Sequence, residues 1–212
     1  MDELRTAALT LGLGLGLSLG LVLGSGGAAR APEAPPRLDP VAAERACADG
    51  AVESCARIGR AYRLGNDGVQ QDLGRALTLL QRACTLSQHR STACADYAEL
   101  LKSGLAGKSD VLAALAVLDR ACGASEPASC AYLGLIYTEG LGVPYTPPYW
   151  RVGVGFYRKA CELGHPGGCW HLGLLLRAGM GVKKDETAAR AFLSKACKAG
   201  EEVACADLNK PR

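Results

Sequence analysis

Aromatic residues are scarce in this chain of 212 residues. Phe, Trp and Tyr together make up 5% of it, which argues against the base-stacking surface of single-strand nucleic-acid binders. A strong excess of charge of one sign is also lacking, because 24 Lys and Arg are mixed with 21 Asp and Glu for a net charge of +3. A basic field for nucleic acid is therefore not expected. Strand-type alternation is hard to find, which favours an all-α chain.

The first forty residues differ in composition from the rest. Residues 7–23 read AALTLGLGLGLSLGLVL and carry no charge. The segment Ala29-Arg30-Ala31 that follows fits the small-x-small cleavage rule, so residues 1–31 are interpreted as a signal peptide. An uncleaved membrane anchor is the alternative, since this apolar stretch is at the short limit for spanning a bilayer. Residues 32–40 then read as a Pro-rich linker.

The ten cysteines form five pairs whose members are eight or ten residues apart. From one first cysteine to the next the steps are 37, 38, 39 and 36 residues, and a fixed period of this size indicates an array of repeats. The pairs are Cys47 with Cys55, Cys84 with Cys94, Cys122 with Cys130, Cys161 with Cys169 and Cys197 with Cys205.

Each repeat predicts two helices. After each of the first four second cysteines, apolar or small residues recur at offsets three, four and seven, the spacing of one helix face. This helix is expected to end at a glycine ten positions on, namely Gly65, Gly104, Gly140 or Gly179. A second helix then runs to the next first cysteine, with Asp72, Asp110 or Asp185 as N-cap. The cysteines are thereby expected at the outer ends of each unit. About four such two-helix units, over residues 41–208, predict an α/α superhelical solenoid with a short tail at 209–212.

Three uses of the cysteines compete. On one continuous helix, residues eight apart lie about 12 Å from one another, beyond the reach of a disulfide. However, glycines between the two cysteines of most pairs predict a turn there, which would let the two sulfur atoms approach. A zinc site would use Cys161, His165, Cys169 and His171, yet the other pairs have no such histidines. A catalytic thiol would be unpaired, and the even count leaves none obvious. We favour five local disulfides that cross-link the solenoid, which also agrees with export.

One face of the first helices is a candidate partner-binding surface. Positions two and five after the second cysteines are expected to share a face away from the core; an ordinary solvated face is the alternative. The residues are Arg57, Arg60, Asp96, Glu99, Tyr132, Leu135, His171 and Leu174. A turn insertion carries Tyr145, Tyr149 and Trp150, which predict either an exposed docking patch or, as we favour, a Trp150 that folds back over the second helix.

This pattern resembles the Sel-one-like repeat, a relative of the tetratricopeptide repeat. The matching residues are CAYLGLIYTEGLGV (130–143) and CWHLGLLLRAGMGVKKDETAARAFLSKAC (169–197), and the second unit is degenerate. With its paired cysteines the chain is similar to the helicobacter cysteine-rich proteins, from about Pro40 to Leu208. A disulfide-rich mitochondrial assembly factor also looks similar.

The resemblance implies a scaffold or adaptor that binds a protein or peptide. From this resemblance together with the predicted signal peptide and the composition, we expect an exported protein that needs no cofactor, metal or nucleic acid. Contact with a membrane is expected only through an uncleaved N-terminus. Some relatives are named β-lactamases or penicillin-binding proteins, so a weak β-lactam hydrolase is an alternative, although no S-x-x-K motif occurs. A second alternative is a structural spacer in the cell envelope that binds no particular partner. The expected location is secreted or periplasmic, with a membrane-anchored form or an oxidising eukaryotic compartment as alternatives.

Overall fold

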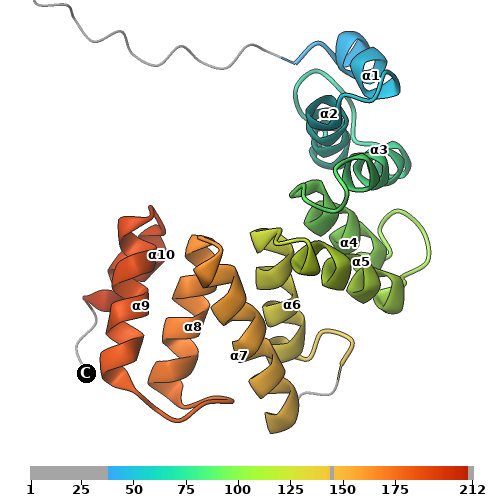
Figure 1. Ribbon diagram of the computed structural model, residues 1–212. Helices are drawn as coiled ribbons and strands as arrows, with labels where there is room; N and C mark the ends of the chain where they lie inside the picture. Colours follow the sequence, from blue (N-terminus) through green and yellow to red (C-terminus); the bar gives the residue numbers. More distant parts are fainter. Residues whose placement is uncertain (1–37, 144–145, 210–212) are drawn as a thin grey trace, which may run out of the picture. The chain divides into compact units, whose positions relative to one another are not determined.

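Ten α-helices and no strand make up residues 38–143 and 146–209, the part of the chain that the computed structural model describes (Figure 1). None of these helices is long and apolar enough to cross a membrane. The expected signal peptide, most of the linker and Tyr145 lie outside the described residues. The helices are α1 (Pro40–Ala48), α2 (Val52–Leu64), α3 (Leu73–Leu86), α4 (Ala93–Ser103), α5 (Val111–Gly123), α6 (Pro127–Glu139), α7 (Pro147–Glu162), α8 (Pro166–Ala178), α9 (Glu186–Lys198) and α10 (Glu202–Leu208).

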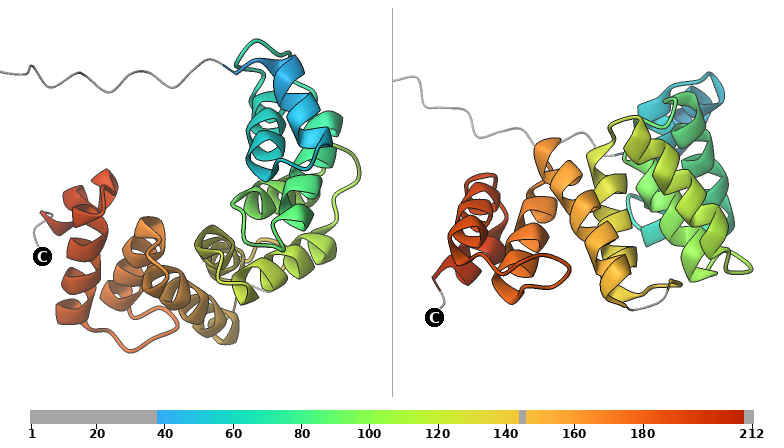
Figure 2. Two further views of the ribbon diagram at one scale, coloured as in Figure 1. Left: turned by 45° about the horizontal axis from the view of Figure 1, so that its top comes forward. Right: turned by 60° about the horizontal axis from the view of Figure 1, so that its bottom comes forward.

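The helices pair into four hairpins that stack in chain order. Helix α2 packs with α3, α4 with α5, α6 with α7 and α8 with α9, while α1 precedes and α10 follows this set. Between hairpins, the second helix of one packs against the first helix of the next, as α3 does with α4. Figure 2 shows this stacking for the described part of the chain. The predicted all-helical solenoid of about four two-helix repeats is thereby confirmed.

The helix ends follow the chemistry of single residues. The side chain of Asp39 accepts hydrogen bonds from the backbone N–H groups of Val41 and Ala42, and Asp72, Asp110 and Asp185 cap α3, α5 and α9 in the same manner. The first helices of the four hairpins all end at a glycine in the left-handed region. At Gly140, for example, φ is 67°, a conformation that costs a residue with a Cβ but not glycine.

The turn insertion of the third hairpin departs from the sequence interpretation. The whole stretch GLGVPYTPPYW is assigned to the turn by the repeat pattern, but α7 already begins at Pro147. Proline is well placed at the first position of a helix, because its missing N–H would have no intrahelical partner there. The insertion therefore lengthens the second helix as well as the turn.

A disulfide joins each hairpin to the next. The bridges link α1 to α2, α3 to α4, α5 to α6, α7 to α8 and α9 to α10, with Cα–Cα distances of 4.5–4.8 Å. Every cysteine is bonded to its nearest sequence neighbour, and none is free. The covalent cross-links therefore lie at the junctions between repeats, where neighbouring units meet. The five bridges are Cys47–Cys55, Cys84–Cys94, Cys122–Cys130, Cys161–Cys169 and Cys197–Cys205.

Most cysteines are buried more deeply than their expected position at the outer ends of the units suggests. Cys55 of α2 and Cys94 of α4 are both 0% exposed. Cys55 packs in the hydrophobic cluster of the first hairpin, and Cys94 in the cluster of the second and third hairpins. The cause is the stacking of the units, because the outer end of one hairpin is covered by the next. These cysteines therefore belong to the core as well as to the cross-links.

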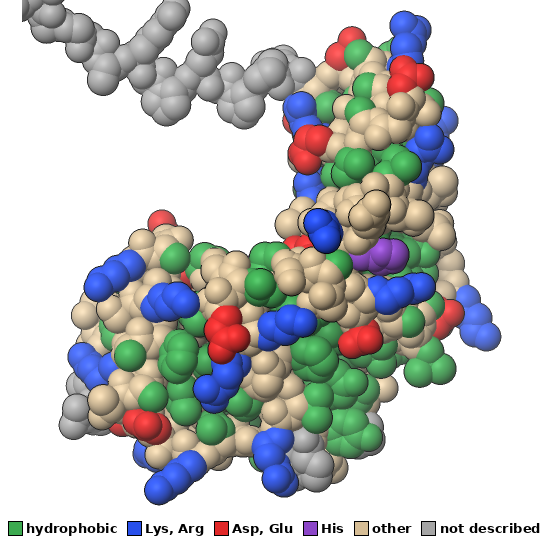
Figure 3. Space-filling model, viewed as in Figure 1, with side chains coloured by type: hydrophobic (Ala, Val, Ile, Leu, Met, Phe, Trp, Pro, Cys, Tyr) green, Lys and Arg blue, Asp and Glu red, His purple; other side chains and the backbone are tan. Residues whose placement is uncertain are grey.

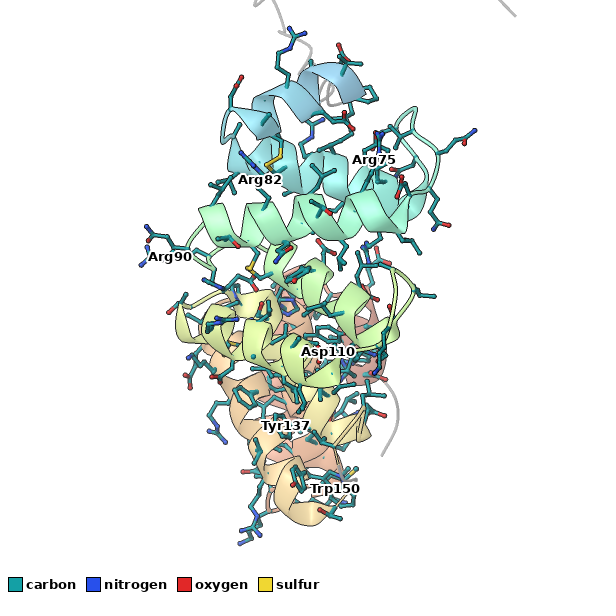
Figure 4. The ribbon with its side chains drawn as sticks, turned by 90° about the vertical axis from the view of Figure 1, so that its right-hand side faces the viewer. Arg75, Arg82, Arg90, Asp110, Tyr137 and Trp150 are labelled. Carbon is teal, nitrogen blue, oxygen red and sulfur yellow. A yellow bond between two sulfur atoms is a disulfide. The ribbon has the colours of Figure 1, made fainter. Side chains whose placement is uncertain are left out.

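A basic side chain adds a second connection at two of these junctions. Arg82 near the end of α3 donates from Nε to the carbonyl oxygen of Cys47 at 3.2 Å and from Nη2 to that of Ala48 at 2.9 Å (Figure 4). Lys195 of α9 donates to the carbonyl oxygen of Cys161 at 3.0 Å. Each cation thus satisfies carbonyl groups at the C-terminal end of the second helix one unit earlier.

Small residues in the first helices let the second helices approach closely. A Cβ placed on Gly134 of α6 would lie 2.7 Å from the ring of Tyr157, which itself is only 1% exposed. Gly59 faces Leu80 and Gly173 faces Leu193 in the same way, at 2.9 and 2.8 Å. The glycine four positions after the second cysteine is therefore a packing requirement of the hairpin.

Candidate functional site

The first helices of successive hairpins lie side by side and form one surface. Helix α4 contacts α6, and α6 contacts α8, while ion pairs connect α2 to α4. Residues that are about one repeat apart in sequence therefore meet across neighbouring helices. This arrangement brings the eight candidate partner-binding residues onto a stripe that runs across α2, α4, α6 and α8, which we call the inner stripe.

The α2–α4 end of the inner stripe is charged. Arg60 donates from Nε to the Asp96 carboxylate at 2.7 Å and also to the hydroxyl of Thr92. Arg63 pairs with Asp96 at 3.2 Å and with Glu99 at 2.6 Å. Such pairs at the protein surface add little stability, but they hold the four side chains in a defined arrangement. The Arg57 side chain beside them is exposed.

Tyr132 of α6 lies at the centre of the inner stripe. The ammonium group of Lys102 from α4 is 5.9 Å from the centroid of its ring, within the range of a cation–π contact. Burial of the phenol, followed by the charge of Glu99, raises the pKa of Tyr132 to about 12. Tyr132 therefore stays neutral at physiological pH and can offer a hydroxyl as well as an aromatic face.

The α8 end of the inner stripe is aromatic. His171 stacks on Tyr157 with ring centroids 4.7 Å apart and contacts Trp170 at 4.4 Å. Burial, with a smaller contribution from the charge of His165, lowers the pKa of His171 to about 4. The Trp170 indole donates to the Asp207 carboxylate of α10 at 2.7 Å. At neutral pH this end is an uncharged ring cluster that α10 helps to hold.

Several side chains of the inner stripe are less exposed to solvent than their helical spacing predicts. Tyr132, Leu135 and Leu174 are partly buried and pack against the hydrophobic clusters of the hairpins. The expectation that these positions lie on a face away from the core is therefore wrong for these three side chains. The cause is the close approach of neighbouring first helices, which turns part of the face into an inter-repeat contact. Arg57 and Glu99 remain exposed.

A row of basic residues beside the inner stripe escaped the sequence interpretation. Arg63, Lys102 and Arg177 stand eight positions after their second cysteines. Arg63 and Lys102 contact stripe residues, and Arg177 donates to the backbone oxygen of Asp207 at 3.2 Å and pairs with Glu186 at 3.5 Å. The sequence did contain a signal for this row, namely a basic residue eight positions after the second cysteine in three of the repeats. On a helix surface this position lies next to the position five residues after the cysteine, which belongs to the inner stripe.

The zinc alternative is wrong, because its two cysteines are bonded to each other as Cys161–Cys169 and provide no thiolate ligand. The Nδ1 atom of His165 accepts a hydrogen bond from the N–H of Gly168 at 3.1 Å and caps α8. Burial lowers the pKa of His165, which favours the neutral ring that this cap requires. Among the described residues, no group of three or more His, Cys, Asp and Glu side chains could hold a metal ion.

The described aromatic residues of the turn insertion pack against other residues of the fold. Tyr149 stacks on Tyr137 at 6.0 Å, and Tyr137 stacks on Phe156 at 5.6 Å. Trp150 is half-buried, and a Cβ on Gly181 of the following turn would lie 2.6 Å from its backbone. Figure 4 shows Tyr137 and Trp150 in this region. Tyr149 and Trp150 therefore pack against their own and the next hairpin, which disfavours the exposed docking patch. The expectation that Trp150 folds back over the second helix is wrong, because Trp150 belongs to the first turn of that helix, α7.

Charges of both signs are interspersed on the face of the molecule shown in Figure 3, with hydrophobic side chains between them. No extended region of one sign is visible on that face. This distribution agrees with the balanced composition of the chain.

Acidification is expected to destabilise the protein through His171. The unfolded chain takes up a proton near pH 6.5, whereas the folded ring does so only near pH 4. Stability is therefore complete above pH 6.5 and is lost as the pH falls between these values, by about 3 kcal/mol for this group. Urea unfolding of wild type and His171→Phe at pH 7 and pH 4.5 measures the effect.

His171→Phe keeps an aromatic ring against Tyr157 but cannot titrate, so its stability should fall less over this pH range. His89→Asn is the matched control, because it removes a histidine from a loop. Equal pH dependence in wild type and His171→Phe would contradict the assignment.

Comparison with known proteins identifies three of the four hairpins directly. The Sel1 repeat model matches residues 52–87, 127–165 and 166–201, which correspond to α2–α3, α6–α7 and α8–α9 with their adjoining loops. The hairpin α4–α5 between them is not matched, in agreement with its degenerate sequence. No curated protein matches the chain at a significant level.

Several solved structures share this architecture. Cysteine rich protein B of Helicobacter pylori is 31% identical, with a TM-score of 0.52 over 65% of this chain and 96% of its own. The protective antigen c5321 of uropathogenic Escherichia coli, which displays an SLR fold, is 24% identical with a TM-score of 0.66 over 81% of this chain, but this chain covers only 35% of it. A Sel1 repeat protein of Oxalobacter formigenes is 20% identical, with a TM-score of 0.64 over 80% of this chain and 74% of its own.

Proposed function

Because the chain belongs to the Sel1 repeat family, we propose that it is an extracytoplasmic scaffold that binds a protein or peptide along the inner stripe. The observation that carries this proposal is the continuity of the stripe across α2, α4, α6 and α8. Stacked helical repeats offer extended surfaces of this kind to their partners. The eight residues first singled out by their spacing are the proposed contact residues.

The disulfides support the proposed location. Five bridges within one chain are typical of proteins that fold outside the reducing cytosol. We therefore retain the proposal that residues 1–31 are an export signal, residues 32–40 a linker, residues 41–208 the binding solenoid and residues 209–212 a tail. Mass spectrometry of the mature protein tests this division, and an intact N-terminus would favour the membrane-anchored alternative.

The side chains of the inner stripe favour an extended peptide with unlike ends. Arg57 and Glu99 near α2 and α4 are exposed charges, suited to polar contacts at the rim of an interface. Tyr132, His171 and Leu174 are only partly buried, and a tyrosine near the centre of an interface often contributes strongly to binding. A partner would thus place polar residues over α2–α4 and apolar residues over α6–α8.

Selection of a displayed peptide library against the oxidised protein tests the proposed surface. Peptides that bind wild type are expected to bind Arg57→Glu and Tyr132→Ala at least tenfold more weakly. The matched control is Arg190→Glu, an exposed charge reversal on the second helix α9, which should leave binding unchanged. The proposal would be overturned if the peptides bound the two stripe variants as tightly as wild type but bound Arg190→Glu much more weakly. Binding would then lie on the face formed by the second helices.

The same preparations distinguish the scaffold from the β-lactam hydrolase. Turnover of a chromogenic β-lactam is expected to stay at the level of buffer for wild type. Turnover that persists through stringent purification would favour the enzyme instead. An envelope spacer would give neither turnover nor selected peptides.

A further inference from the structure

The disulfide between α9 and α10 is more exposed than the other four. Each of the eight cysteines in those four bridges is buried, with at most 3% of its surface exposed. Cys197 and Cys205, in contrast, are both only partly buried. Accessibility to an attacking thiolate is one of the main factors in the rate of thiol–disulfide exchange. The structure therefore singles out Cys197–Cys205 as the most accessible bridge.

The repeat architecture explains this exposure. At other junctions the second helix of the following hairpin lies close to the bridge, as Arg82 of α3 does beside Cys47 and Lys195 of α9 beside Cys161. Within the described residues, no second helix follows α10. In this part of the chain, the bridge at α9–α10 consequently has no second helix packed over it, unlike the earlier bridges.

Helix α10 is short and is the last helix of the described residues. It has seven residues, and its N-cap Glu201 makes no side-chain capping bond. A helix of this length does not persist in isolation. Its non-covalent anchors include the burial of Ala204 and Asp207, the packing of Leu208, the hydrogen bond from Trp170 to the Asp207 carboxylate and that from Arg177 to the Asp207 backbone oxygen.

We propose that Cys197–Cys205 is a thiol–disulfide exchange site for a dithiol reductant, and that its opening releases α10 while the four hairpins stay folded. One reductant thiolate attacks a sulfur of the bridge, which forms a mixed disulfide and expels the other cysteine as a thiolate that takes up a proton. The second reductant thiol then displaces the bound cysteine. The protein gains two thiols, and the reductant becomes a disulfide.

Release of α10 would uncover an apolar surface at the end of the inner stripe. Trp170, Leu174 and Phe192 pack in the same hydrophobic cluster as Ala204 and Leu208 of α10. Without α10, these three side chains lose part of their cover, and Trp170 loses its hydrogen-bond partner. The exchange itself is independent of the proposed function; only an effect on partner binding through Leu174 rests on it.

Graded reduction of the folded protein tests the site. Oxidised protein is incubated with increasing dithiothreitol, quenched with N-ethylmaleimide and mapped by peptide mass spectrometry. Cys197 and Cys205 are expected to be labelled at least tenfold faster than any other pair, including the fully buried Cys55 and Cys94 with their partners. Another pair that opens first, or five pairs that open together, would overturn the proposal.

Hydrogen exchange of the double variant Cys197→Ser/Cys205→Ser tests the release of α10. Amides of residues 202–208 are expected to exchange at least tenfold faster than in wild type, with α2–α8 unchanged. The control Cys122→Ser/Cys130→Ser removes a buried central bridge and should instead affect α5 and α6. Full protection of α10 in the first variant, or loss of protection throughout the chain, would each refute a local release.

Discussion

Reduction of all five disulfides is expected to unfold the solenoid at 37 °C. Each bridge closes a segment of nine or eleven residues and contributes about 2.5–3 kcal/mol in the chain-entropy model. Together the bridges therefore match the whole stability of a typical domain, about 5–15 kcal/mol. Reduction removes the cross-link at every junction between repeats. The stability of a stack of repeats depends on these nearest-neighbour interfaces. Circular dichroism should show a melting temperature lower by about 25–50 °C in a phosphine reductant.

Two controls accompany this measurement. Oxidised protein treated with the alkylating agent alone should melt like untreated protein, because no cysteine is free to react. Reduced and alkylated protein should stay unfolded after the reductant is removed. Coincident melting curves of the reduced and oxidised samples would mean that non-covalent packing is sufficient at the junctions.

Tyr157→Ala is expected to cost about 3–5 kcal/mol, the range for deleting a large buried aromatic side chain. The Tyr157 ring is 1% exposed, lies against the backbone of Gly134 and stacks on His171 at 4.7 Å. It therefore connects α6, α7 and α8, and its removal would leave a cavity between these helices. Urea unfolding of the oxidised variant measures the loss.

Two substitutions in the same helix make this test specific. Tyr157→Phe keeps the ring and should remain within about 1.5 kcal/mol of wild type. Val152→Ala removes a side chain that is 44% exposed and should change the stability by no more than about 0.5 kcal/mol. If Tyr157→Ala cost no more than Val152→Ala, the ring would not be the contact that joins the two hairpins.

Much of the fold could be predicted because its signals are local. The interval from Cys122 to Cys130 and the glycine at 140 mark the ends of helices within one unit, and the capping aspartate at 72 needs only the three residues that follow it. The insertion before α7 could not be placed as well. Prolines occur in turns and in the first turn of a helix alike, so PYTPPYW did not reveal that α7 begins at Pro147.

The candidate site was harder to predict than the fold. Helical spacing placed Arg60 and Asp96 on equivalent faces of two helices, but it did not show that they bond to each other across 36 residues of sequence. It also missed Trp170, which sits one position after a cysteine and contacts both His171 and Asp207. These contacts depend on how far each helix is rotated relative to its neighbour.

The sequence by itself determined the number and order of the hairpins, the aspartate caps of their second helices, the glycines that end their first helices and the cysteine pairs, since each follows from patterns that repeat within about forty residues. Only the tertiary structure decided which residues of the inner stripe remain exposed, that a basic residue reaches back to the preceding unit, and that Cys55 and Cys94 are fully buried while Cys197–Cys205 is less covered. The physical reason is that burial is a property of neighbouring units. A position identical in spacing is buried where another helix packs over it and accessible where none does.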